Sequence, residues 1–400
     1  MATGETKKGF KPVAGVKLAA LSCGIKDGGV EDLVLFEFVE GTETAGVFTQ
    51  SVFAAAPVTI GKQHLEQKRA RYFLINSGNA NAGTGEAGIN DALLCCQSLS
   101  QVTGASPEAV IPFSTGVIGE RLPVAKITDA LEQGKALLDE NNWLQAAEGI
   151  MTTDTRPKIA SREILIGNKT ITLTGIAKGA GMIQPNMATM LCYIATDAKV
   201  ERGLLQSFLR DCTEKSFNRI TVDSDTSTND SFMLSATGKS GLEIKADNAK
   251  IFVQALESLS LELAKSIIRD AEGATKFIAV SVSGGKHQKD CLAIAYSIAN
   301  SPLVKTAMFA SDANWGRIFM AIGKAGVKID LNKLDVFLGD VQVMERGQKH
   351  TSYTESKGAT AVAGEDINIT VNLNAGEIEE TVWTSDLSHE YIRINAEYRS

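Results

Sequence analysis

The chain has 400 residues, of which 44% are hydrophobic and 22% are charged, and its formal net charge is −7. This is the composition of a globular protein with a sizeable core, roughly two or three domains in length, and it excludes collagen-like and disordered chains. Because basic residues form no block, no apolar run reaches about 18 residues and the N-terminus lacks an apolar signal core, we expect a cytoplasmic protein that binds neither nucleic acid nor membranes.

The spacing of apolar residues along the chain predicts a mixed α/β fold. Strands are expected at residues 32–39, 71–76, 190–195, 276–283, 366–373 and 377–384, and helices at residues 91–102, 204–212 and 252–267. Asn374-Ala375-Gly376 predicts a turn that joins the last two strands into a hairpin. Ser283-Gly284-Gly285 is the candidate boundary of a C-terminal mixed α/β lobe over residues 285–400.

Cysteine and histidine residues give no local sign of a metal site. None of the six cysteines forms a CxxC motif, which favours reduced core cysteines of a cytosolic protein. The four histidines are far apart in sequence, and none is spaced as a pair of metal ligands. A His-based metal site or a Ser-His-Asp triad stays open in space but has no local support, so an enzyme built from this chain would have to take its general base from another residue type.

One glycine motif offers an alternative function. Gly83, Gly85 and Gly88 form GxGxxG after a predicted strand and before a predicted helix, which is the local context of a dinucleotide-binding turn. The long polar segment between the strand and these glycines does not fit that motif. The competing interpretation is a glycine-permissive loop that opens a helix.

Residues 177–195 carry the main argument about function. A glycine-rich loop, AKGAGMIQPN, is followed at once by an apolar run that predicts a buried strand. Thr189 stands at the start of this strand, where a β-branched residue is also common for purely structural reasons.

Cleavage before Thr189 would give that residue a second role. A threonine at a new N-terminus carries a hydroxyl nucleophile and an α-amino group with a reference pKa of about 7.7–8.0, which suits a general base near neutral pH. The chain could cut itself, because the Thr189 hydroxyl can attack the Ala188–Thr189 peptide and form an ester that water then hydrolyses. The preceding glycines would allow the tight backbone geometry that this attack needs.

Several long segments resemble one family in its own order. They are VAGVKLAALSCGIK, NSGNANAGTGEAG, PFSTGVIGERLP, KGAGMIQPNMATML, DSDTSTNDS, ASDANWGRI and INAEYRS. Together they resemble the ornithine acetyltransferases, also called glutamate N-acetyltransferases of arginine biosynthesis, over essentially the whole chain.

The resemblance implies a role for each matching residue. Thr189 would be the nucleophile, and the cut at Ala188–Thr189 would give fragments of residues 1–188 and 189–400 that share one core. Thr115 and Gly116 would form the oxyanion hole, although from sequence alone they also fit an ordinary turn. The implied substrate-binding residues are Thr152, Lys178, Thr189, Glu272, Asn395 and Ser400, for which surface positions or helix ends are the alternatives.

The implied fold is a two-sheet αββα sandwich, similar to N-terminal-nucleophile-like enzymes, with a C-terminal mixed α/β lobe. The implied reaction moves an acetyl group from N2-acetyl-L-ornithine to L-glutamate through an acetyl-Thr189 ester. Some members also use acetyl-CoA as a co-substrate, and the resemblance implies no metal or prosthetic group. The cleaved pair is expected to form an α2β2 heterotetramer. A self-processed amidase or aminopeptidase, in which water is the acceptor, stays open as the alternative enzyme.

Overall fold

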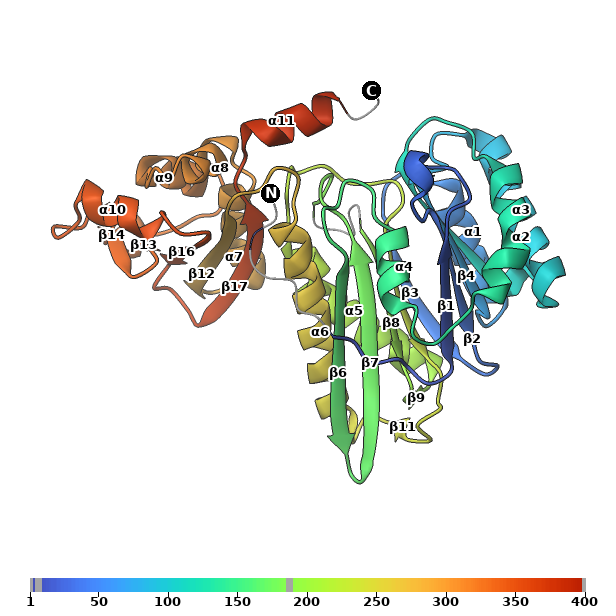
Figure 1. The fold of residues 1–400 in the computed structure, drawn as a ribbon. Helices are drawn as coiled ribbons and strands as arrows, with labels where there is room; N and C mark the ends of the chain where they lie inside the picture. The colour runs from blue at the N-terminus through green and yellow to red at the C-terminus, as the bar shows by residue number, and fades with distance from the viewer. Residues whose placement is uncertain (1–2, 4–8, 185–189, 398–400) are drawn as a thin grey trace. The chain divides into compact units, whose positions relative to one another are not determined.

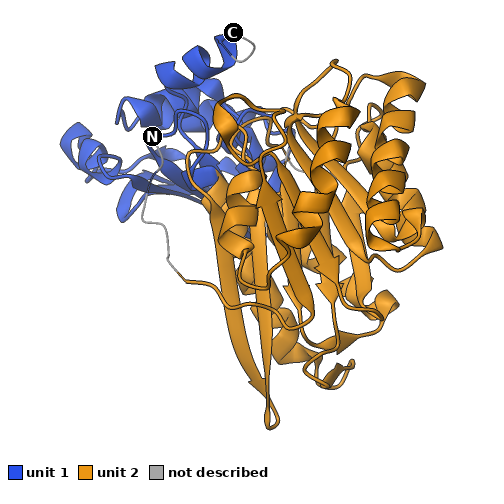
Figure 2. Cartoon of the chain, turned by 45° about the vertical axis from the view of Figure 1, so that its right-hand side comes forward, with its two compact units in different colours: residues 1–5, 219–224, 268–400 blue, residues 6–218, 225–267 orange. Residues whose placement is uncertain are grey.

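The computed structural model describes residue 3 and residues 9–184 and 190–397 of the chain. The chain divides into two compact units, which Figure 2 colours separately. Unit 1 contains residues 1–5, 219–224 and 268–400, and unit 2 contains residues 6–218 and 225–267. The expected C-terminal lobe over residues 285–400 lies within unit 1.

Unit 2 is built on two β-sheets. The first sheet has the order β1-β2-β4-β5, formed by Val16–Leu21, Leu33–Phe38, Tyr72–Asn79 and Val110–Val117. The second has the order β3-β10-β8-β7-β6, formed by Glu43–Phe48, Ser231–Ala236, Leu191–Thr196, Lys169–Lys178 and Lys158–Ile166. A short parallel pair joins β9 (Lys199–Val200), which follows β8 in sequence, to β11 (Glu243–Ile244), which follows β10.

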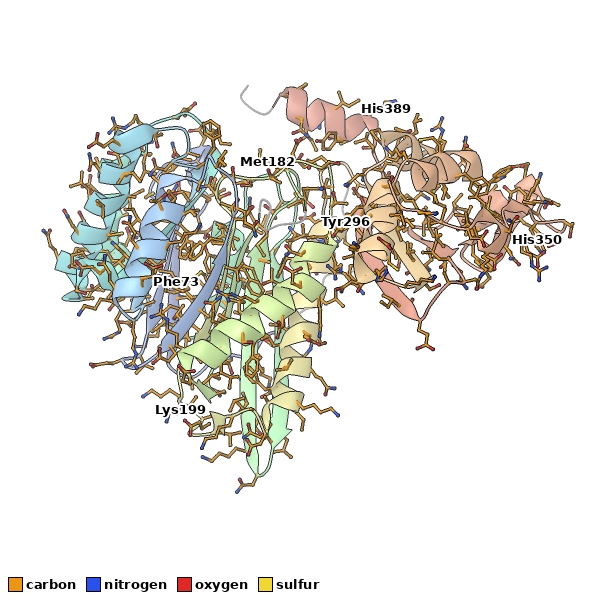
Figure 3. The ribbon with its side chains drawn as sticks, turned by 180° about the vertical axis from the view of Figure 1, so that it is seen from behind. Phe73, Met182, Lys199, Tyr296, His350 and His389 are labelled. Atoms are coloured by element: carbon orange, nitrogen blue, oxygen red, sulfur yellow. The ribbon has the colours of Figure 1, made fainter. Side chains whose placement is uncertain are left out.

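Apolar side chains from both sheets meet in one core. Phe36 and Phe73 from the first sheet pack with Tyr193 and Met233 from the second, and all four are at most 1% exposed. The ring centroids of Phe73, which Figure 3 labels, and Tyr193 are 5.7 Å apart. Aromatic pairs at this separation contribute beyond the area that they bury. The two sheets therefore form a sandwich.

Helices cover the outer faces of this sandwich (Figure 1). α2 (Gly85–Thr103) and α3 (Val124–Ala136) share a second apolar cluster with the first sheet. α5 (Arg202–Lys215) and α6 (Ala249–Arg269) lie on the second sheet, where Leu259 and Leu263 of α6 approach Gly175 of β7. The remaining helices are α1 (Ala56–Gln67) and α4 (Trp143–Gly149). This confirms the predicted αββα layers.

Unit 1 is a mixed α/β lobe, as predicted. Its six-stranded sheet has the order β15-β14-β13-β16-β12-β17, formed by Gln348–Lys349, Val341–Glu345, Asp335–Leu338, Asp366–Asn372, Phe277–Gly285 and Ile378–Ser385. The helices are α7 (Gln288–Ala299), α8 (Pro302–Phe309), α9 (Trp315–Gly323), α10 (Glu355–Ala361) and α11 (His389–Ala396). Its core includes Val280 and Val282 of β12 packed with Ile294 and Ile298 of α7.

The predicted C-terminal hairpin is wrong. β16 and β17 do not pair with each other, because β12 lies between them, parallel to β16 and antiparallel to β17. The intervening loop crosses the end of β12, where the Ala375 and Gly376 amides donate to the Gly284 carbonyl at 2.8 and 2.7 Å. β12 is buried at Val280 and Val282 and takes the central position between the two strands, which a local turn pattern does not indicate.

The other predicted elements are confirmed with shifted ends. The expected strand at residues 190–195 is β8, and the expected helix at residues 91–102 is the C-terminal part of α2, which ends at Gly104 with φ +76°. All six cysteines are free thiols, and five of them are buried, as core cysteines should be. No helix in the described parts of the chain combines the length and the apolar character needed to cross a membrane.

Candidate active site

Three strand ends meet at one end of the sandwich. β7 runs antiparallel to β8, so that Lys178 pairs with Leu191, and β8 runs parallel to β10, so that Leu191 also pairs with Ser231. In Figure 3, Met182, four residues after Lys178, and Lys199, just after β8, mark opposite ends of unit 2. β8 therefore begins between the end of β7 and the start of β10. Thr189 precedes β8 in sequence, but Thr189 and the Ala188–Thr189 bond lie outside the described residues.

The Lys178 side chain is buried at this end. Its Nζ atom donates to Thr152 Oγ1 at 2.8 Å and to Thr115 Oγ1 at 3.1 Å, and the residue is 3% exposed. Thr152 follows α4, Thr115 is in β5 and Lys178 is in β7. These residues are far apart in sequence, but their side chains meet at the Lys178 ammonium group. All three were among the predicted oxyanion-hole and substrate-binding residues.

The buried carboxylate of Asp154 holds the backbone next to Lys178 and Thr152 in place. Asp154 accepts hydrogen bonds from Lys158 Nζ at 2.5 Å, the Gly179 amide at 2.7 Å and the Thr152 amide at 3.1 Å. Burial alone would raise the pKa of the Asp154 carboxyl, but the ammonium groups of Lys158 and Lys178 and the Gly179 amide outweigh it and hold that pKa well below its usual range. Asp154 therefore stays ionised and fixes both the end of β7 and the loop that carries Thr152.

Gly116 can only be glycine at its position. Its φ is +136°, and a Cβ atom there would lie 2.2 Å from the Gly78 carbonyl carbon in the neighbouring strand. Thr115 and Gly116 both belong to β5, where the pairing with β4 shifts register at Gly78 and Asn79. The alternative that they form an ordinary turn is wrong. The close approach of two backbones leaves Thr115 facing Lys178.

The loop before β10 connects both sheets, and the sequence did not reveal this. Asn229 Nδ2 donates to the Ala80 carbonyl at 2.6 Å and to the Ser114 carbonyl at 2.9 Å, next to Thr115. Asp230 Oδ1 accepts from the Met190 amide at 2.8 Å. The one available signal was the polar segment DSDTSTNDS directly before a strand whose six residues are all buried.

Two further predicted residues contact each other in unit 1. Asn395 Nδ2 in α11 donates to Glu272 Oε2 at 2.8 Å. Glu272 is in a turn after α6, not in the helix terminus that was the alternative, because α6 ends at Arg269. Gly273 takes φ +68°, and a Cβ atom there would lie 2.5 Å from the Tyr391 amide nitrogen. Ser400 lies outside the described residues.

The GxGxxG segment forms a self-contained loop. α2 begins at Gly85 and crosses between the parallel strands β4 and β5, as in a dinucleotide-binding unit. However, Asn81 Nδ2 donates to the Gly88 carbonyl at 2.9 Å, and Thr84 Oγ1 donates to Asn81 Oδ1 at 2.8 Å. These side chains close the turn on itself, which favours the interpretation as a loop that opens a helix.

Comparison with known proteins identifies the family of the chain. The model of the ArgJ family matches residues 17–400. The chain belongs to the ArgJ family. It is 53% identical over 394 residues to the arginine biosynthesis bifunctional protein ArgJ of Pseudomonas fluorescens and 52% identical to that of Pseudomonas syringae, with 97% of each chain covered.

A solved structure gives the same result. The chain is similar to the crystal structure of the arginine biosynthesis bifunctional protein ArgJ from Bacillus halodurans, with 37% identity and a TM-score of 0.50. That match covers 52% of this chain and 98% of the other. The predicted family is therefore confirmed. The roles of Thr115, Gly116, Thr152, Lys178, Glu272 and Asn395 stay predictions of residue function.

Proposed function

We propose that this chain is a glutamate N-acetyltransferase of arginine biosynthesis, which moves an acetyl group from N2-acetyl-L-ornithine to L-glutamate. The observation that carries the proposal is the buried Lys178 ammonium, held by the Thr115 and Thr152 hydroxyls where β7 meets the start of β8. Membership of the ArgJ family, and relatives named for arginine biosynthesis, support the substrate class.

The reaction begins with self-cleavage at Ala188–Thr189. The Thr189 hydroxyl attacks the Ala188 carbonyl carbon, the ester replaces the peptide bond, and water releases Thr189 with a free α-amino group. That amine then takes the hydroxyl proton as Thr189 attacks the acetyl carbonyl of acetylornithine, and ornithine leaves. Glutamate attacks the acetyl ester and regenerates the enzyme, so one nucleophile serves both half-reactions.

The surrounding residues stabilise the transition state and bind the substrate. The Thr115 hydroxyl and the Gly116 amide stabilise the oxygen that becomes negative in the tetrahedral state, and one such donor lowers the barrier by about 3–4 kcal/mol. Lys178 binds the substrate α-carboxylate. Glu272, held by Asn395, pairs with an amino group of ornithine, and Ser400 completes the set.

Acetyl-CoA is proposed as a second acetyl donor, and no tightly bound cofactor is proposed. The name of the relatives, bifunctional protein, supports a second activity. Acetylation of glutamate by acetyl-CoA, with acetylornithine absent, tests this donor. The mature form is proposed to be a cytoplasmic α2β2 heterotetramer of the two fragments.

A denaturing gel with N-terminal sequencing tests the mechanism. We expect two bands, the second beginning Thr-Met-Leu-Cys-Tyr, and one uncut, inactive chain for Thr189→Ala, which lacks the hydroxyl. Cleavage of Thr189→Ala at the same bond would overturn the mechanism. Product analysis with and without glutamate separates the transferase from an amidase, because an amidase would release acetate equally fast without glutamate.

A further inference from the structure

One side-chain amide joins the two sheets of unit 2 next to the predicted oxyanion hole. Asn229, in the loop before β10, is 8% exposed. Its Nδ2 atom donates to the Ser114 carbonyl at 2.9 Å and to the Ala80 carbonyl at 2.6 Å, and its Oδ1 atom accepts from the Thr228 hydroxyl at 2.5 Å. Both protons of the amide are therefore used on backbone carbonyls, and none remains for a substrate.

The loop that carries Asn229 is anchored on the second sheet. The Thr49 amide, just after β3, donates to the Asp230 carbonyl at 3.0 Å, and Thr49 Oγ1 donates to the Ser227 carbonyl at 2.7 Å. The backbone amide of Asn229 donates to Ser227 Oγ at 3.0 Å. Because the loop is bonded on either side of Asn229, the side chain of that residue is held in one place.

On the first sheet, Asn229 contacts the backbone near both sides of residues 115–116. The Ser114 carbonyl belongs to the peptide bond that leads into residue 115. Ala80, the other partner, donates its own amide to the Val117 carbonyl at 2.9 Å, directly after residue 116. One side chain thereby holds the backbone before and after the two residues of the predicted oxyanion hole.

The hydroxyl of Thr115 is arranged as a donor. Its Oγ1 atom accepts from Lys178 Nζ at 3.1 Å, so its own proton is left for another acceptor. The direction of the Gly116 amide is set by the backbone, which is confined by Gly78 of the neighbouring strand. Donors of this kind lower a barrier only when they already point to the place where charge develops.

We propose that Asn229 is a positioning residue for the oxyanion hole, whose side-chain amide aligns the Thr115 hydroxyl and the Gly116 amide with the acyl oxygen that becomes negative. This inference rests on the proposed function. Asn229 acts through these two residues, because its own amide protons are already bonded. Its loss should therefore weaken stabilisation of the transition state and leave the binding of a ligand without an acyl oxygen unchanged.

Two substitutions test the proposal in cleaved enzyme. Asn229→Ala removes both donors. Asn142→Ala is the matched control, because Asn142 Nδ2 likewise donates to two backbone carbonyls of separate segments, Leu18 in β1 and Leu137 at the end of α3, at 3.0 Å each. We expect Asn229→Ala to lower kcat by about 10-fold or more, since outright removal of an oxyanion donor costs about 10²–10³. Asn142→Ala should leave kcat unchanged, and wild-type kcat in Asn229→Ala would overturn the proposal.

Binding of the product ornithine separates positioning from general damage to the site. Ornithine has no acetyl carbonyl, so it makes no use of an oxyanion hole. Calorimetric titration should give the same Kd for ornithine in Asn229→Ala as in the wild type, while kcat/KM for acetylornithine falls. Equal losses of ornithine affinity and kcat/KM would refute the proposal, because they would show a site disrupted as a whole.

Hydrogen exchange tests the geometry without requiring activity or cleavage. The comparison uses uncut Thr189→Ala protein with and without Asn229→Ala, and it follows the backbone amides of residues 115–117. Loss of the two Asn229 bonds should speed their exchange by about 10-fold, whereas Asn142→Ala in the same background should not. Unchanged exchange would refute the positioning role. Wild-type protein without acetyltransferase activity would instead refute the proposed function, so the two failures are distinct.

Discussion

At the scale of single residues, we expect Lys178 to contribute to substrate binding and Asp154 to contribute to stability. Lys178→Met should reduce kcat/KM for acetylornithine by about 100-fold or more, because the substrate carboxylate loses a buried, charge-assisted partner. Lys169→Met is the control, since Lys169 is an exposed residue at the other end of β7. Steady-state kinetics of both variants test this prediction. Equal reductions of kcat/KM in the two variants would show that Lys178 has no special role in binding.

Asp154 should matter for stability. Asp154→Asn leaves Lys158 buried without its carboxylate, and breaking such a pair costs about 3–5 kcal/mol of unfolding free energy. Because the pKa of Asp154 is lowered in the folded chain, its contribution is present above the unfolded pKa of about 3.9 and is lost as pH falls below it. Denaturant titrations across this range should show less acid sensitivity in Asp154→Asn than in the wild type.

At the scale of elements, the close approach of the parallel strands β4 and β5 at Gly78 and Gly116 sets the geometry of the predicted oxyanion hole. Gly116→Ala should destabilise the chain by more than about 2 kcal/mol and abolish cleavage, because the added carbon meets backbone atoms that cannot move aside. Gly323→Ala, at the end of α9 in open space, should be close to neutral. Melting temperatures and gels of the two variants test this, and a stable, cleaved Gly116→Ala protein would contradict it.

The elements also show what sequence patterns can and cannot predict. Local periodicity was sufficient for β8, α5 and α6, because each buries one face or a whole run of apolar residues. The hairpin failed because strand order depends on β12, about 90 residues earlier in the chain. Asn229 and Asp230 were missed for the same reason: Asn229 bonds to Ala80, 149 residues away, and Asp230 bonds to Met190, 40 residues away. Asp154 likewise bonds to the Gly179 amide 25 residues away, and the spacing of residues in the sequence does not reveal such bonds.

The site residues could not be predicted from local sequence patterns either. Thr115, Thr152 and Lys178 came from a family resemblance, and the structure brings their side chains together. Nothing in their own neighbourhoods distinguished them from turns and helix ends. Gly116 was predicted as part of the oxyanion hole, and its φ and the close approach of Gly78 show that the backbone also requires glycine there.

At the scale of the whole molecule, the second sheet draws strands from both sides of the predicted cut. β3, β7 and β6 precede residue 188, and β10 and β8 follow it, in the order β3-β10-β8-β7-β6. We expect the two fragments to elute together in native size-exclusion chromatography and to separate only in denaturant, because each supplies hydrogen-bonding neighbours to the other. Separation of the cleaved fragments in native buffer would contradict this expectation.

This interleaving has a further consequence for how the enzyme is made. An intact chain can insert the β10–β8 pair between β3 and β7 as an intramolecular event, whereas two free pieces must first find each other in solution. The rate of refolding from denaturant should therefore be independent of protein concentration for Thr189→Ala. For the mature protein, refolding should be second order in the fragments and its yield should be low. The chain would therefore have to fold before it cleaves itself. After cleavage, the lifetime of the active enzyme would depend on a slow rate of unfolding, because the separated fragments refold poorly.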